Sequence, residues 1–344
     1  MWDFEALAGF VQLRQDKPAC CFPYGNEKES HQRMAEMEEL MYKKDENILL
    51  AGVDHGFSTM KTPHFIFENG VEELKGEATL TNNTLVYQGK QYKAGEGRLP
   101  MKRTKTEDES YFLLTLTAIA KEMNYYHKSD VDVILAAGLP FARFGQEKQE
   151  FREYLLRRGD IAYCYCGKEY RIRIREVHLF PQCYAAVADR LRQFGPEMLC
   201  VDIGSKTVDI IHTNHYVPIE RESTSIPEAL ISCMENIKSA VYQNCNRRVS
   251  EEQIRWMIIK GDAPMPGDCK EIIRSRLQDF AKGMEAKLSE LGFDLEMIPV
   301  VYIGGGASVM KRYGTLTGEH VVYLEDVRAN AKGYEYLAKR KCGW

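Results

Sequence analysis

The sequence predicts an α/β protein built from two similar halves, and three stretches support this prediction. In residues 199–211 an apolar run ends at Asp202, turns through Gly204 and resumes as a second apolar run. Residues 50–61 repeat this strand–turn–strand pattern in the first half of the chain. Residues 298–310 begin as a β-branched strand, pass through three glycines and continue as a helix. Two such units and a glycine turn indicate two halves that face a shared ligand.

The two repeated turns have residues suited to a phosphate and its metal ion. A carboxylate stands at the end of each first strand, and the glycine that follows lets backbone N–H groups point toward an anion. One Asp-x-Gly turn is more often an ordinary β-turn, whereas two in register favour a shared phosphate site. The residues in register are Val53, Asp54, Gly56 and Thr59 in the first unit, and Val201, Asp202, Gly204 and Thr207 in the second.

On these stretches the chain resembles the actin-like ATPase superfamily, and most of all its bacterial ParM/StbA branch. The resemblance extends over roughly residues 48–340. It implies an α/β actin-like fold, which is a duplicated RNase H-like fold of two domains with a nucleotide cleft between them. Domain I would comprise residues 48–195 and 326–344, and domain II would comprise residues 196–325.

The resemblance also implies the residues of the site. Asp54 and Asp202 would face each other and hold Mg²⁺ largely through water, which suits a cation that loses its water reluctantly. Gln182, which follows Pro181, lies where the family places the side chain that orients the attacking water. The nucleotide contacts would come from three loops that contain Gly56, Phe57, Ser58, Thr59 and Lys61, then Gly204, Ser205, Lys206 and Thr207, and finally Gly304, Gly305, Gly306 and Ser308.

Two of these assignments have alternatives. ParM has Glu where this chain has Gln182, and actin has Gln; because Gln is a poor proton acceptor, slow hydrolysis is expected. The simpler interpretation is that Gln182 only begins a helix after Pro181. Lys206 replaces a small residue of the commoner family pattern, and it could reach either the γ-phosphate or solvent.

Hydrophobic spacing and turn residues predict the remaining elements. Helices are expected at residues 108–125, 226–241, 269–291 and 330–335, the last resembling the helix that returns to the first domain. Further strands are expected at residues 62–67, 84–86, 91–93, 131–136, 161–165, 169–174, 256–260 and 321–324. The 226–241 helix would carry Pro227 in its first turn, with Ser223, Thr224 and Ser225 available as caps.

The polar stretch from Gly95 to Asp108 predicts a mobile loop. It contains a local basic cluster formed by Lys102, Arg103 and Lys105. A solvated loop is the simpler interpretation of these cations, and a contact between filament subunits is the alternative.

Composition excludes some partners. The formal net charge is −4, so no broad basic surface predicts direct binding to nucleic acid. No apolar run has the length of a membrane span, and Asp3 and Glu5 stand where a secretory signal would be basic, so a cytoplasmic protein is expected. Residues 1–47 do not match the family. This N-terminal extension could pack on its own domain or contact a neighbouring subunit; its acidic residues disfavour contact with an anionic membrane.

The resemblance implies a polymerising ATPase whose filaments separate plasmid DNA. Its cofactors would be Mg²⁺ and ATP, with GTP as the alternative nucleotide. Its partners would be further copies of itself and a DNA-binding adaptor of the ParR type. An MreB- or FtsA-like shape or division protein is an alternative, as is a small-molecule kinase of the same superfold, although no separate substrate motif is found. No peptide-binding domain follows residue 344, which disfavours a chaperone.

Overall fold

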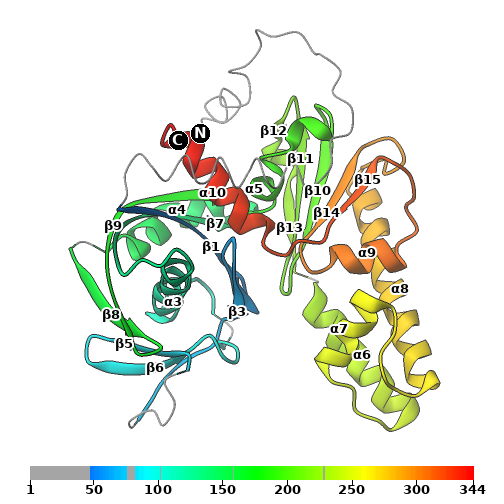
Figure 1. Ribbon diagram of the computed structural model, residues 1–344. Helices are drawn as coiled ribbons and strands as arrows, with labels where there is room; N and C mark the ends of the chain where they lie inside the picture. Colours follow the sequence, from blue (N-terminus) through cyan, green and yellow to red (C-terminus); the bar gives the residue numbers. More distant parts are fainter. Residues whose placement is uncertain (1–46, 76–81, 101, 158, 228) are drawn as a thin grey trace.

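The computed structural model describes residues 47–75, 82–100, 102–157, 159–227 and 229–344. These residues form two lobes, each with a β-sheet covered by helices (Figure 1). The predicted α/β fold is therefore confirmed. The predicted N-terminal extension lies outside the described residues, apart from Asn47. Among the described helices, none combines the length and the apolar character that a membrane crossing requires.

The first sheet contains the strands up to residue 181. Within the described ranges its strand order is β3-β2-β1-β7-β9-β8-β5-β6-β4. The strands are β1 (Ile48–His55), β2 (Thr59–Lys61), β3 (Ile66–Glu68), β4 (Val71–Glu73), β5 (Thr84–Tyr87), β6 (Lys90–Ala94), β7 (Asp130–Leu139), β8 (Ile161–Tyr165) and β9 (Lys168–Pro181). Strands β1, β7 and β9 are parallel neighbours, so their carboxyl ends meet at one edge of the sheet.

Helices cover both faces of this sheet. Leu49, Ala51 and Val53 of β1 pack in the core that also receives α3 (Ser110–Tyr125) and α4 (Phe141–Leu155). Leu50 instead packs with Tyr334 of α10 (Ala329–Lys341). Because successive side chains of a strand point to opposite faces, α3 and α10 lie on opposite sides of β1, as Figure 1 shows.

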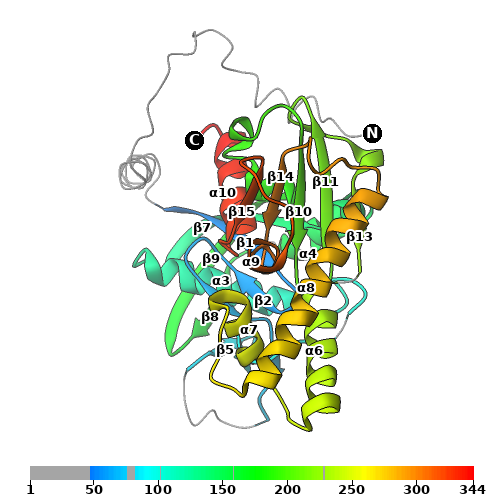
Figure 2. The same cartoon turned by 90° about the vertical axis from the view of Figure 1, so that its right-hand side faces the viewer.

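The second sheet follows in the chain. Its described strands have the order β12-β11-β10-β14-β15, and β13 pairs with β11. They are β10 (Met198–Ile203), β11 (Val208–Asn214), β12 (Val217–Pro218), β13 (Thr224–Ile226), β14 (Val300–Ile303) and β15 (Val321–Leu324). The helices of this lobe, seen in front of and below the sheet in Figure 2, are α6 (Leu230–Cys245), α7 (Glu251–Lys260), α8 (Gly267–Glu290) and α9 (Ala307–Tyr313).

A shared apolar cluster joins the two lobes. One face of the second sheet packs on α6 to α9. Its other face, with Cys200 and Ile211, packs on α5 (Tyr184–Val187) and on Phe141 at the start of α4. Since α4 also belongs to the core of the first lobe, this cluster fixes one sheet against the other.

Helix α10 approaches its neighbours backbone to backbone. A Cβ atom on Gly333 would overlap the carbonyl oxygen of Ala185 in α5, and one on Gly52 of β1 would overlap that of Ala331. Glycine therefore allows α10 to rest against the first sheet and α5 together. The expectation of a returning helix at 330–335 is confirmed, and the helix is longer than predicted.

Two predicted strands were wrong. Residues 62–67 form no single strand, because Pro63 interrupts the run and the Phe65 N–H bonds the hydroxyl of Thr62 in a turn between β2 and β3. Residues 256–260 belong to helix α7, whose start has a capping box between Ser250 and Gln253 that the sequence analysis missed.

The helix predicted at 226–241 is present, but it begins at Leu230 and continues to Cys245. Residues Thr224–Ile226 pair with β11 as a strand. The Ser223 hydroxyl donates to the carbonyl oxygen of Ile219 and does not cap a helix. The predicted hairpin at 161–174 is confirmed, but β9 continues without a break to Pro181. After β9 come the short helix α5 and a 3₁₀ turn at Leu191–Gln193.

The close packing of α10 gives a test of the fold. We expect Gly333→Ala to lower the free energy of unfolding by about 1–3 kcal/mol, because the new methyl group overlaps the Ala185 carbonyl. Gly283→Ala is the matched control, since Gly283 lies within α8 with no atom near its missing Cβ. It should raise the same free energy by up to about 1 kcal/mol. Urea unfolding measures both, and equal effects of the two changes would contradict this packing.

Candidate active site

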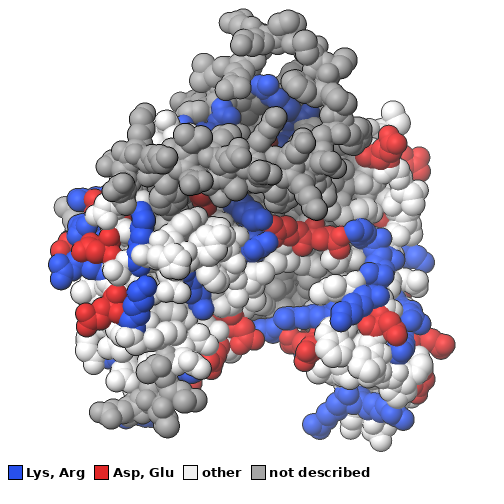
Figure 3. Space-filling model, in the orientation of Figure 1, with Lys and Arg blue, Asp and Glu red and all other residues white. Residues whose placement is uncertain are grey.

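The predicted site residues lie at the carboxyl ends of parallel strands in both sheets. Asp54 is near the end of β1, and Gln182 directly follows β9. In the second sheet, Asp202 of β10 pairs with Ile303 of β14, and Gly304 comes next. Ligands of open α/β sheets bind outside such strand ends. The surface is hollowed between the two lobes, with acidic and basic side chains along the rim (Figure 3).

Asp54 is buried and held by two side chains. Lys61 donates a hydrogen bond to its Oδ2 at 2.8 Å, and the Gln182 amide donates to its Oδ1 at 3.1 Å. Burial opposes ionisation, but the charge and hydrogen bond of Lys61 outweigh it and hold the pKa of Asp54 below its ordinary value. The Gln182 side chain therefore contacts Asp54, and helix α5 begins only at Tyr184.

Asp202 is the counterpart of Asp54 in the second lobe. Asn330 of α10 donates to its Oδ2 at 2.7 Å and accepts from the Cys183 N–H at 2.9 Å. Burial, helped by the negative charge of Asp54, raises the pKa of Asp202 to about 6. Asn330 thus ties α10 and α5 to the acidic corner, a role that the sequence analysis did not give it.

A third carboxylate, Asp209, completes the acidic group. It is the cross-strand partner of Asp202, so both side chains lie on the same face of the sheet. Ser225 of β13 donates to its Oδ1. Burial and the charge of Asp202 raise the pKa of Asp209 to about 7. The sequence analysis assigned Asp209 no role, although a symmetric hairpin around the 204–207 turn would have placed it opposite Asp202.

The two predicted phosphate loops contact each other. Lys206 lies with its Nζ 5.1 Å from the ring centroid of Phe57, so it crosses from the second loop to the first. The Ser58 hydroxyl is buried and has no hydrogen-bond partner among the described residues. The second loop is a tight turn in which the Gly204 N–H bonds the Thr207 carbonyl at 3.0 Å.

The third predicted loop adjoins Asp202. Gly304 has φ of +78°, and a Cβ there would overlap a carboxylate oxygen of Asp202. A Cβ on Gly306 would likewise overlap the Ile203 side chain. Ser308, in contrast, donates to Glu325 at 3.0 Å on the exposed side of α9. The structure therefore brings the glycines to the acidic corner but pairs Ser308 elsewhere.

Lys105 contradicts the prediction of a wholly solvated basic loop. It is half-buried, and its Nζ donates to the Gly138 carbonyl at the end of β7. Burial lowers the pKa of Lys105 to about 8. Of the other two cations of this loop, Arg103 is exposed, whereas Lys102 is largely buried in an ion pair with Asp108.

One ion pair bridges the lobes away from the acidic corner. Arg98, which follows β6, donates to both carboxylate oxygens of Glu251 at 2.6 and 3.2 Å. Glu251 opens helix α7 of the other lobe and also pairs with Lys238 at 3.3 Å. A bidentate pair of this kind restrains the separation of the two lobes.

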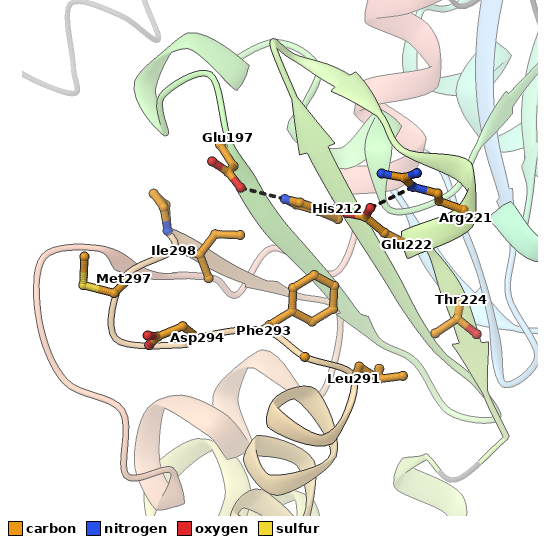
Figure 4. A pocket seen from close by; sticks show the side chains of 12 residues that line it. Glu197, His212, Arg221, Glu222, Thr224, Leu291, Phe293, Asp294, Met297 and Ile298 are labelled. Atoms are coloured by element: carbon orange, nitrogen blue, oxygen red, sulfur yellow. Dashed lines mark hydrogen bonds and ion pairs between the residues drawn. The ribbon is translucent and has the colours of Figure 1, made fainter.

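A separate hollow of about 490 Å³ lies at the far end of β10 (Figure 4). There His212 contacts Glu222 at 2.7 Å and Glu197 at 3.1 Å, and Arg221 also bonds Glu222. Glu197 directly precedes β10 whereas Asp202 lies near its other end, so a strand length of roughly 16 Å separates the two places. His212, Glu197, Glu222 and Arg221 are thus paired with one another. This hollow is not part of the site between the lobes.

Comparison with known proteins identifies the class. Residues 52–184 match the family model of the actin like proteins N terminal domain. The archaeal actin homolog Ta0583 superposes with a TM-score of 0.70 at 16% identity, over 85% of this chain and 99% of that one. The Alp12 filament structure gives 0.66 at 18%, over 86% and 99%. Bacillus thuringiensis ParM with ATP gives 0.64 at 14%, over 87% and 100%. Among curated proteins, no sequence matches.

The fold is therefore that of the actin-like proteins. Within it, residues 52–184 match the model of their N-terminal domain, and the ParM structures share the fold that the sequence resemblance indicated.

The buried carboxyls give a pH-dependent prediction. The pKa of Asp209 is about 7 in the folded protein against an ordinary 3.8, so the folded state binds its proton more tightly than the unfolded state. This contribution to stability is complete below about pH 4 and is lost as pH rises through 7. We expect Asp209→Asn to stabilise the protein at pH 8 by roughly 1–4 kcal/mol, and by much less at pH 4.

Urea unfolding without divalent cations, at pH 4, 6 and 8, measures this difference. Asp279→Asn is the control, because it makes the same chemical change at an exposed position on α8. A difference between Asp209→Asn and the unchanged protein that is constant from pH 4 to 8 would contradict the burial of this carboxyl.

Proposed function

We propose that this chain is an actin-like ATPase that assembles into filaments while its cleft holds Mg²⁺ and ATP. The observation that carries the proposal is the meeting of Asp54 and Asp202, one from each lobe, beside two glycine turns. Bacillus thuringiensis ParM is known with ATP, and Alp12 is known as a filament. These relatives support nucleotide binding and self-association by this chain.

The residues present fit a magnesium triphosphate. Three buried carboxylates, Asp54, Asp202 and Asp209, repel one another, and a divalent cation would offset that repulsion. The buried Ser58 hydroxyl lacks a partner that a phosphate oxygen would supply. The glycine at 304 leaves no side chain between the backbone and a ligand beside Asp202. When bound, the metal ion would neutralise phosphate charge and help to orient the γ-phosphate.

The side chains of the chain then have separate tasks. Lys61 contributes a positive charge beside Asp54, and the backbone N–H groups of the two loops bind phosphate oxygens. Gln182 would exchange its bond to Asp54 for one to the attacking water. Gln orients water but accepts a proton poorly, so we infer that hydrolysis is slow and that filaments persist.

Contacts between the lobes can couple the nucleotide to assembly. Asn330 touches Asp202 and the backbone of α5, so a change at the acidic corner is transmitted to α10. A ligand shifts the angle between the lobes only if it makes different contacts in two lobe orientations. Neighbouring subunits in a filament would favour one of these two orientations.

The remaining assignments rest on the resemblance to the ParM branch. We propose plasmid DNA segregation as the cellular task, with a ParR-type adaptor as the link to DNA and the cytoplasm as the location. We keep the division into domain I (residues 48–195 and 326–344) and domain II (residues 196–325) as part of the same proposal.

Light scattering tests the proposed assembly. With Mg²⁺ and ATP the signal should rise and later fall as nucleotide is hydrolysed. Asp202→Ala should abolish the rise, because the cleft loses the carboxylate that the second lobe contributes. Asp279→Ala removes an exposed aspartate from α8 and should leave the rise unchanged. Electron microscopy of the same samples shows whether scattering comes from filaments. Phosphorylation of a small substrate without filaments would support a kinase instead.

The bridge between Arg98 and Glu251 gives a kinetic prediction. If it holds the lobes together, Arg98→Glu should speed the release of a fluorescent ATP analogue by about 2- to 5-fold, as expected for losing a partly exposed ion pair. Glu251→Arg should act in the same direction. The double charge reversal should restore slow release, since opposite charges again meet across the cleft. If the double variant releases the analogue as fast as the faster of the two single variants, the ion pair does not hold the lobes together.

A further inference from the structure

We propose that Lys105 is a phosphate-binding side chain of the cleft and that it contacts the terminal phosphate of the nucleotide. This inference rests on the proposed function and adds to it a cation from outside the three predicted loops. Lys105 comes from the segment between β6 and α3, which the sequence analysis interpreted as solvated.

The position of the ammonium group is fixed by two contacts. Its Nζ donates to the Gly138 carbonyl oxygen at 3.3 Å and lies 5.5 Å from the ring centroid of Phe151. Gly138 is the second-last residue of β7, the strand between β1 and β9 in the first sheet. Asp54 is the second-last residue of one neighbouring strand, and Gln182 follows the other. Lys105 therefore contacts the end of the central strand, β7, between the strand that carries Asp54 and the strand that precedes Gln182. We propose Asp54 for metal binding and Gln182 for orienting water.

The charge of Lys105 is incompletely balanced in the protein. No carboxylate of the described residues forms an ion pair with it, although it is half-buried. The more distant charges of Asp54 and Glu147 favour its protonated form, whereas Lys61 and Arg143 oppose it. Removing an ammonium from water without an adjacent anion is costly. A phosphate group in the cleft would supply the missing anion, and two N–H donors remain for it after the bond to Gly138.

The loop that carries Lys105 is anchored on both sides of it. Glu107 accepts hydrogen bonds from the backbone N–H groups of Arg103 and Thr104. Arg143 of α4 donates to the Arg103 carbonyl at 2.7 Å, and Thr106 bonds Glu150 of the same helix. A cation held in this way is oriented before the ligand arrives, so little conformational freedom is lost on binding.

The two neighbouring cations are differently placed. Lys102 is neutralised by Asp108 and also bonds Ser110, so its charge is already balanced. The Arg103 side chain is exposed. Lys105 alone in this cluster combines burial, a position at the strand ends and the lack of an adjacent carboxylate. Arg103 consequently provides a control that removes one positive charge from the same loop without changing the strand ends.

Nucleotide affinity tests the inference in the full chain. Isothermal titration calorimetry should compare Mg-ATP with Mg-ADP for the unchanged protein and for K105M, which keeps the aliphatic stem over Phe151 and removes the charge. K105M should weaken ATP binding by roughly 10- to 100-fold and ADP binding by no more than about 3-fold, because ADP lacks the terminal phosphate. K105R should restore most of the ATP affinity, and R103A should change either affinity by less than about 2-fold.

The readouts separate this inference from the proposed function. A purely structural role of Lys105 would weaken ATP and ADP equally, and that result would overturn the inference. So would a K105M variant whose preference for ATP over ADP is unchanged. Thermal unfolding of each variant without nucleotide shows whether a loss reflects an altered fold, and recovery in K105R excludes that explanation. If the unchanged protein binds neither nucleotide, the proposed function itself fails and this inference fails with it.

Discussion

The structure depends on burying carboxylates from two lobes in one place. Asp54 gains Lys61 and the Gln182 amide, whereas Asp202 gains the Asn330 amide. The two pKa values shift in opposite directions. Lys61 lowers the pKa of Asp54. Burial raises the pKa of Asp202, although the hydrogen bond from the Asn330 amide opposes this rise. Asp54 in the first lobe therefore ionises more readily than an ordinary aspartate, and Asp202 in the second lobe ionises less readily. This imbalance fits the proposal that a metal ion binds at the boundary between the lobes.

Helix α10 makes the relation between the lobes definite. It lies on the first sheet through Gly52, reaches α5 through Gly333, and contacts the second sheet through Asn330. The apolar cluster around Phe141 supports the same junction from the other side of α5. These contacts lie near the acidic corner, whereas Arg98 and Glu251 meet between β6 and α7. Motion between the lobes would therefore pivot near α10 and separate the ends that the ion pair joins.

The errors in the sequence analysis have a common physical origin. Residues 256–260 were interpreted as a strand from their apolar character, but the capping box at Ser250 shows that the helix begins earlier. Thr224–Ile226 form a strand only because β11 offers an unpaired edge, which no local pattern reveals. Lys105 looked solvated because it stands among polar residues. Its burial arises from contacts with Gly138 and Phe151, both distant in the chain.

The sequence by itself determined the α/β class, the two repeated strand–turn–strand units and the glycine turn after β14. Alternation along strands and glycine in tight turns are local properties, so Asp54, Asp202 and Gly304 could be found from spacing alone. Tertiary structure decided which side chains complete the corner. Asp209 enters through cross-strand pairing, Asn330 through the return of α10, and Lys105 through a loop folded over the strand ends. These three contacts depend on packing between residues that are distant in the chain. Local sequence patterns carry no information about such packing.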